Sequence, residues 1–168
     1  MRFPLTSFIT VLLLSVSAMA LNVARTDTAD KKPPHPKVCD PNAKGKDLEK
    51  RQYDAVADFA DLFLFKQDVR AAFDKYVPGE YIQHNPFAEQ GRDFAIEVLT
   101  GGVASGIVST NLTFFVGNGY GLMHYKSVFM NTTYAIVDYF RFKGTCIVEH
   151  WDVLQEITGD EPNPIAFF

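Results

Sequence analysis

The chain of 168 residues carries 16 basic and 20 acidic side chains, which gives a formal net charge of −4 at pH 7. Because no basic stretch interleaved with aromatic residues accompanies this mild acidity, we predict that nucleic acid is not a partner. Aromatic residues make up 14% of the chain, and phenylalanine contributes 15 of them. This content suits a sheet that curls around an apolar interior.

Residues 1–20 have the layout of a secretory signal peptide. Arg2 supplies the positive start, FITVLLLSVSAMA supplies a short apolar centre, and Ala18 and Ala20 supply the small residues before cleavage. The apolar run is shorter than the roughly 20 residues that a membrane-spanning helix needs. We therefore predict a secreted, extracellular protein that begins near Leu21 and has no membrane contact after cleavage.

Two other features fit the secretory route. The sequons that begin at Asn111 and Asn131 predict N-glycosylation, which requires exposed positions. Cys39 and Cys146 could form a disulfide in an oxidising compartment. The alternative, a buried free Cys146 and a solvent-exposed Cys39, stays equally open on the sequence alone.

The rest of the chain divides into an arm and one domain. Residues 21–46 are polar and contain prolines, which predicts a flexible arm. Residues 47–168 are numerous enough to bury one core. At the start of this domain, apolar residues at spacings of three and four predict a first helix that runs from Asp47 to Phe63.

Two shorter helices are expected to follow. Asp68 is the predicted N-cap of the second, over residues 69–77, and Pro78 with Gly79 ends it. The sequence RDFAIEVLT predicts the third helix over residues 92–100. The glycine pair at 101–102 is the expected stop for this helix.

From residue 110 onward the pattern becomes that of strands. The segments TNLTFFV, LMHYKSVFM, YAIVDYFRF and CIVEHWDVL are rich in β-branched and aromatic residues, and short turn sequences separate them. Helices followed by consecutive strands predict an α+β fold. In this fold about three helices cover one face of a curved antiparallel sheet.

The last hairpin carries the most chemically informative side chains. If residues 143–145 form a three-residue loop, Asp138 lies opposite His150 and Asp152 is its diagonal neighbour. A two-residue turn would put Asp138 beside Trp151 instead, and we prefer the first arrangement. Two carboxylates and an imidazole in an apolar cavity can serve as acid and base near neutral pH. The alternative leaves His150 and Asp152 in solvent and Trp151 in the core, because alternation does not identify the inner face.

Other kinds of site find little support in the sequence. No glycine-rich phosphate loop follows a strand, and no Gly-x-Ser-x-Gly elbow is present. A zinc site built from His84, His124, His150 and an aspartate would match no compact ligand pattern. We therefore predict no metal and no organic cofactor, which leaves acid–base chemistry.

The motif YIQHNPFAEQGRDF, followed by VDYFRFKGTCIVEHWDVLQEI and NPIAFF, resembles the SnoaL-like polyketide cyclase family. The similarity extends from Asp47 to the carboxyl terminus and is greatest to the branch of predicted aldol-condensation-catalysing proteins. This family belongs to the nuclear-transport-factor-like superfamily. The resemblance implies a cone of strongly curved antiparallel sheet packed on helices, a cystatin-like or SnoaL-like α+β barrel with a pocket at its open end.

The resemblance also implies catalytic roles. In the characterised cyclases, an aspartate in a His-x-Asp setting on the last strand is the acid/base for an intramolecular aldol ring closure. His150 and Asp152 match that setting, and Asp138 stands where those cyclases carry a pocket histidine. The hexapeptide YIQHNP would lie at the mouth of the cone with His84 directed into the cavity. His84 or His150 would then protonate the new alkoxide.

The resemblance leaves three functions open. The first is a cofactor-independent cyclase or isomerase that acts on a small hydrophobic carbonyl compound. The second is a non-catalytic binding module for a small hydrophobic ligand, and the third is a homodimeric scaffold. For the first two, the expected substrate contacts are Tyr81, Gln83, His124 and Phe140.

Overall fold

The computed structural model describes residues 39–168. The predicted signal peptide and residues 21–38 of the predicted arm lie outside the described residues. Within 39–168, no helix is both long and apolar enough to cross a bilayer. The elements are α1 (Leu48–Ala60), η1 (Asp61–Phe65), α2 (Val69–Tyr76), β1 (Ile82–Gln83), α3 (Arg92–Ala104), β2 (Val108–Gly117), β3 (Tyr120–Phe129), β4 (Thr132–Lys143) and β5 (Cys146–Ile157).

The first predicted helix is present as α1 and its π-helical continuation η1. Val56 and Phe59 of α1 are buried, as the apolar spacing predicts. In η1 the backbone N–H of Lys66 donates to the carbonyl of Asp61, five residues earlier. Such wide turns are rare in helices and are frequent near functional sites. Here the wide turn contains Phe63, which lines a cavity described below.

The second helix follows its predicted signals and the third does not. The carboxylate of Asp68 accepts a hydrogen bond from the backbone N–H of Ala71, so the predicted N-cap of α2 is confirmed. The predicted stop of α3 at Gly101–Gly102 is wrong, because the helix continues to Ala104. The left-handed residue that follows the helix is Gly106, with a φ of 83°.

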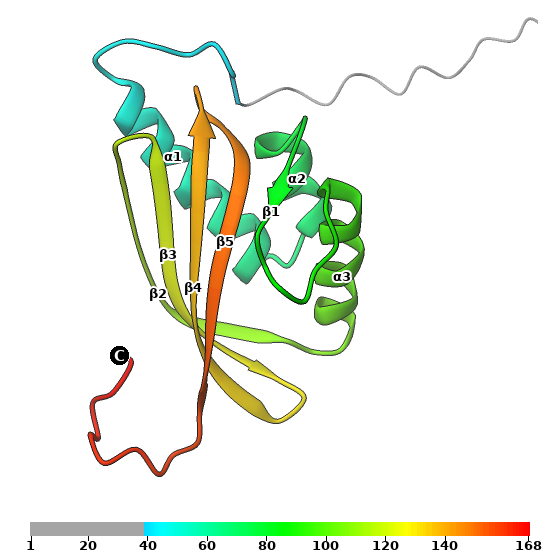
Figure 1. Ribbon diagram of the computed structural model, residues 1–168, viewed down its shortest axis with the longest axis vertical. Helices are drawn as coiled ribbons and strands as arrows, with labels where there is room; N and C mark the ends of the chain where they lie inside the picture. Colours follow the sequence, from blue (N-terminus) through cyan, green and yellow to red (C-terminus); the bar gives the residue numbers. More distant parts are fainter. Residues whose placement is uncertain (1–38) are drawn as a thin grey trace, which may run out of the picture. The chain divides into compact units, whose positions relative to one another are not determined.

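The predicted α+β class is confirmed, and the sheet is mixed. Its strand order is β1-β5-β4-β3-β2, in which β2 to β5 are antiparallel neighbours. The short strand β1, within the YIQHNP hexapeptide, pairs parallel with β5, so the expectation of a purely antiparallel sheet is wrong. Figure 1 shows that the long strands bend along their length and that α1 crosses one face of the sheet.

The register of β4 against β5 differs from the prediction. Lys143 pairs with Cys146, so the turn contains two residues rather than three. A bulge follows at Val148, which has no partner on β4. Beyond the bulge, from Arg141 back toward Thr133, each residue of β4 pairs with a residue one position further along β5 than the turn alone would give. Asp138 therefore lies opposite Asp152 rather than opposite His150. The side chains still share one face, because the bulge cancels the change of face that the short turn would cause.

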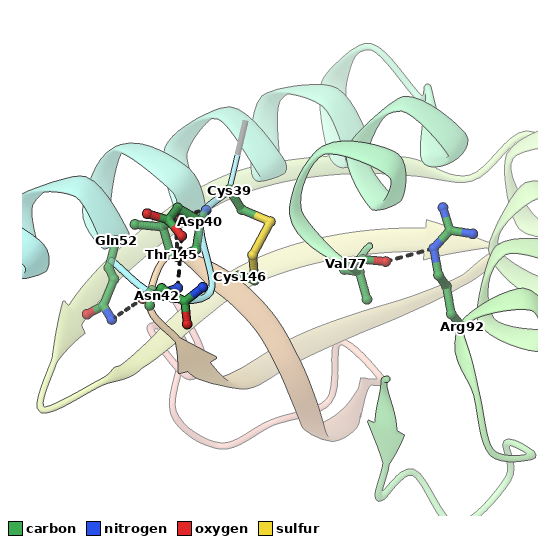
Figure 2. Close-up of a disulfide and its surroundings, with 9 residues drawn as sticks. Cys39, Asp40, Asn42, Gln52, Val77, Arg92, Thr145 and Cys146 are labelled. Atoms are coloured by element: carbon green, nitrogen blue, oxygen red, sulfur yellow. Dashed lines mark hydrogen bonds between the residues drawn. A yellow bond between two sulfur atoms is a disulfide. The ribbon is translucent and has the colours of Figure 1, made fainter. Parts of the chain in front are cut away.

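The end of the predicted arm, from Cys39, is packed against the domain. Cys39 forms a disulfide with Cys146, and both residues are buried. Figure 2 shows the neighbouring contacts: the backbone N–H of Asp40 donates to the Thr145 hydroxyl at 2.7 Å, and the Gln52 amide donates to the carbonyl of Gly144. The flexible arm therefore does not extend to Lys46 as predicted. Its last described residues cover the turn between β4 and β5.

We predict that the disulfide contributes substantially to stability. It closes a loop of 107 residues, and loops of that size restrict the unfolded chain strongly. Replacement of Cys39 and Cys146 by serine should lower the free energy of unfolding by about 2 to 5 kcal/mol. Urea unfolding with and without reductant measures this, and the double variant should not respond to reductant. Equal stability of the oxidised and reduced wild-type protein would contradict the prediction.

Candidate functional site

A cavity of about 260 Å³ lies between the helices and the inner face of the sheet. Most of its wall is apolar and comes from α1, η1, α2, α3 and the central strands. The aromatic part of the wall consists of Phe59, Phe63, Phe73, Tyr81, Phe94, Tyr125 and Phe140. The polar part of the wall comes from β4, β5 and the segment around β1, and it consists of Gln83, Asn85, Asp138, His150 and Asp152.

The three predicted ionisable residues meet at this polar wall. One nitrogen or oxygen atom from each of Asp138, His150 and Asp152 lies within 4.8 Å of the others. Asp138 and His150 are buried. The alternative with His150 in solvent and Trp151 in the core is excluded, because His150 is buried and Val153, on the same face of β5 as Trp151, is 67% exposed. The two carboxylates and the imidazole therefore line the cavity, which alternation left open and which the resemblance implies.

The hydrogen bonds around His150 determine where its protons lie. The backbone N–H of Asn85 can only donate, so the atom of Gln83 that it contacts at 3.0 Å must be the amide oxygen. The same oxygen lies 2.9 Å from Nδ1 of His150, which must therefore carry a proton. Nε2 of His150 lies 3.1 Å from Asp138, whose other oxygen accepts from the Tyr125 hydroxyl. One further proton is thus held between His150 and Asp138.

Asp152 is bound on one side only. The backbone N–H of Phe87 donates to the side-chain oxygen of Asn85, which turns the Asn85 amide nitrogen toward Asp152. That nitrogen donates to Oδ2 of Asp152 at 2.6 Å. The other oxygen, Oδ1, is buried and has no partner within residues 39–168. Because a buried acceptor is costly to leave unpaired, this atom indicates a site for a ligand's hydrogen.

Two tyrosines beside this network remain neutral donors. Burial raises the pKa of the Tyr81 and Tyr125 phenols far above the usual value, and the charge of Asp138 raises both further. The imidazole ring of His150 lies against the rings of Tyr81 and Phe140, with centroids 6.1 and 5.1 Å away. Aromatic side chains therefore hold the His150 ring in position while its two nitrogens are both hydrogen-bonded.

The expectation that His84 enters the cavity is wrong. Its neighbour Gln83 points inward from β1, and strand alternation turns His84 outward. The ring of His84 stacks on Trp151 with centroids 4.5 Å apart, and its Nε2 lies 2.8 Å from Glu149. Hydrogen bonds from His84 and then from Arg141 lower the pKa of Glu149. His84 thus belongs to an ion-pair cluster on the outer face of the sheet.

The expectation that His124 contacts substrate is also wrong. Its neighbours Met123 and Tyr125 are buried on the inner face of β3, so His124 faces the other way. Its ring stacks on Phe168, with centroids 4.7 Å apart. Of the four predicted substrate contacts, Tyr81, Gln83 and Phe140 do line the cavity.

Sequence reasoning missed the partners of the predicted residues. Asn85 of the YIQHNP hexapeptide is not among the predicted site residues, yet it holds Asp152. Tyr125, which binds Asp138, was read as part of a strand and given no role. Both contacts join residues that lie far apart in sequence. The alternation within β3 does place Tyr125 on the face opposite to His124, and this signal could have suggested an inward hydroxyl.

A metal ion would have to compete with this network. Asp138, His150 and Asp152 could each offer one ligand atom. However, Nε2 of His150 already bonds to Asp138 and Nδ1 bonds to Gln83, so ligation by His150 would break a hydrogen bond. His84 and His124 lie away from the cavity and could not complete a coordination shell. The arrangement as it stands suits proton transfer.

The fold is similar to that of two solved structures. One is AclR from Streptomyces galilaeus, provisionally assigned as a hydroxylase, with a TM-score of 0.53, 13% identity, and coverage of 64% of this chain and 90% of AclR. The other is TsrD from Streptomyces laurentii, with a TM-score of 0.50, 15% identity, and coverage of 64% and 91%. At such low identity the similarity concerns the fold alone. Comparison of the sequence with protein-family models and with curated proteins gives no match.

We predict that Tyr125→Phe destabilises the protein. The substitution removes the hydrogen bond to one oxygen of the buried Asp138 and leaves that oxygen unpaired, which costs about 1 to 3 kcal/mol. Urea unfolding measures the loss. Tyr139→Phe is the matched control, because the Tyr139 side chain is on the exposed face of β4. Equal stabilities of the two variants would contradict the assigned role of Tyr125.

We also predict a loss of stability at alkaline pH. The pKa values of Tyr76, Tyr81 and Tyr125 are raised in the folded protein, mainly by burial. In the unfolded chain these tyrosines ionise near pH 10, so the folded state loses stability as the pH rises above about 10. Tyrosinate absorbance and circular dichroism, recorded together, should show that the ionisation of these three tyrosines coincides with unfolding. Ionisation of all seven tyrosines in a folded protein would contradict this.

Proposed function

We propose that the protein is a cofactor-independent acid–base enzyme that acts on a small hydrophobic carbonyl compound by aldol-type cyclisation or isomerisation. The observation that carries this proposal is the buried, unpartnered Oδ1 of Asp152, a residue that lines the mainly apolar cavity. A carboxylate oxygen with no protein donor is free to take a proton from a bound molecule. The apolar wall would exclude water from that step.

In the proposed reaction, Asp152 takes a proton from a carbon that lies between two carbonyl groups. The resulting enolate attacks a third carbonyl group, further along the same molecule, which forms a carbon–carbon bond and an alkoxide. Asp152 then returns its proton to the alkoxide, so no external donor is consumed. The donor role expected for His84 thereby passes to Asp152, because His84 lies outside the cavity.

The remaining polar residues position Asp152 and the substrate. Asn85 holds Oδ2 of Asp152, and Oδ1 has no donor within residues 39–168. The proton shared by His150 and Asp138 offsets the negative charge of Asp138, which lies opposite Asp152. The same proton favours negative charge on a nearby enolate. Positioning in such a site can contribute several kcal/mol, roughly 7 to 11 in favourable intramolecular cases.

We further propose that the chain is a secreted SnoaL-like protein and that its bent sheet and helices form the cone of the nuclear-transport-factor-like superfamily. The fold similarity to AclR and TsrD is compatible with that architecture. The disulfide supports an oxidising compartment. Both sequon residues, Asn111 and Asn131, are exposed, as glycosylation would require.

Replacement of Asp152 by asparagine tests the acid–base role. Deuterium incorporation from solvent at the acidic carbon of a 3-oxo ester, followed by nuclear magnetic resonance, measures the first step. We expect the rate of catalysed exchange to fall by about 10² to 10⁴-fold in Asp152→Asn, while the affinity for the ester is retained. Asp160→Asn is the matched control, because Asp160 is exposed in the segment after β5. Equal exchange by Asp152→Asn and wild type would remove Asp152 as the base.

A binding module is the second candidate function. It is favoured by the two nitrogens of His150, which are both satisfied within the protein, and by the mainly apolar wall. In that case wild-type protein would bind the ester without accelerating exchange. The same measurement therefore separates the two candidates.

A further inference from the structure

A second cavity adjoins the first. It has a volume of about 200 Å³ and lies among η1, α3, β2 and β3. Both cavities are lined by Phe63, Val98, Leu99, Ile107 and Tyr125. Each cavity alone is smaller than the roughly 300 to 1,000 Å³ of typical ligand sites, whereas the two together fall within that range.

The polar side chains in the second cavity need no ligand. The amide nitrogen of Gln67 donates to the carbonyl of Ile107 at 2.7 Å. The hydroxyls of Ser109 and Ser127 lie 3.2 Å apart and bond to each other. The Tyr125 hydroxyl donates to Asp138. Within residues 39–168, no side-chain polar atom of the second cavity is both buried and unpartnered, in contrast to the oxygen of Asp152 in the first cavity.

We propose that the two cavities form one extended site for a ligand with a polar carbonyl head and a linear apolar chain. The head lies at Asp152, and the chain passes Phe63 and Leu99 into the second cavity. The extended site deepens the proposed function by naming its substrate class, a carbonyl compound that bears an apolar chain. It rests on the proposed function only for the assignment of the polar head as a carbonyl group. Apolar burial supplies the affinity, because each methylene that enters the second cavity leaves water.

Gly102 sets the length of chain that fits. It lines the second cavity but not the first, and a Cβ built at this position meets no atom within 4 Å. A side chain at residue 102 would therefore extend into open space in the cavity. Gly101, the preceding residue of α3, is exposed and lines neither cavity, although it also has room for a Cβ. The two glycines provide a test variant and a matched control in one helix.

The test uses straight-chain 3-oxo esters of increasing alkyl length at concentrations at which they stay monomeric. Calorimetry on the full-length, disulfide-bonded protein measures their affinities. In wild type we expect the affinity to rise about fourfold for each added methylene until the second cavity is full. In Gly102→Leu the rise should stop at a shorter chain, and the longest ester should bind at least about tenfold more weakly. Gly101→Leu should match wild type.

Two results would overturn the proposal: an affinity that is independent of chain length in wild type, or an unchanged length limit in Gly102→Leu. If the leucine variant does not fold, Gly102→Ala takes its place, with an expected loss of about fourfold for the longest ester. Failure of the proposed function looks different. Chain-length-dependent binding without deuterium exchange contradicts the acid–base reaction and supports the extended site, whereas exchange on short esters with no length dependence overturns the extended site alone.

Discussion

The pairing of β4 with β5 is the constraint on which the site depends. A two-residue turn alone would bring Asp138 opposite Trp151 and would put its side chain on the other face of the sheet from His150 and Asp152. The bulge at Val148 adds one residue to β5 and brings Asp138 opposite Asp152. The segment that begins at Cys39 covers the turn of this hairpin. The disulfide therefore holds in place the same β4–β5 hairpin whose register the bulge sets.

That geometry buries Asp138 and one oxygen of Asp152, and the surrounding residues follow from the need to compensate them. An isolated buried charge is very unfavourable, so donors must be close. Asp138 receives Tyr125 and His150, and the orientation of His150 is set in turn by Gln83 from β1. A strand of two residues thereby determines which protons the site holds. Asp152 is the one member left with a free oxygen.

The helices provide the apolar part of the same site. Phe63 of the π-helical turn and Leu99 of α3 line both cavities. Because α3 continues through its glycine pair, the helix passes the second cavity at a residue that has no side chain. The helices thus contribute the space for an apolar chain, and the sheet contributes the polar groups that would bind the carbonyl head.

The sequence by itself determined the elements whose signals are local. Spacing of apolar residues predicted α1, and the N-cap at Asp68 predicted the start of α2. Alternation predicted that His150 and Asp152 share one face, because the side-chain period of a strand is two regardless of its neighbours. These features depend on residues within a few positions of one another.

Only the tertiary structure decided the contacts that complete the site. The parallel pairing of β1 turned Gln83 inward and His84 outward, and 67 residues separate Gln83 from His150. The bulge at Val148 and the helical course of Gly101–Gly102 likewise depend on packing rather than on local preference. Contacts over such separations have no periodic signal in a single sequence, because they are set by which surfaces meet when the chain folds.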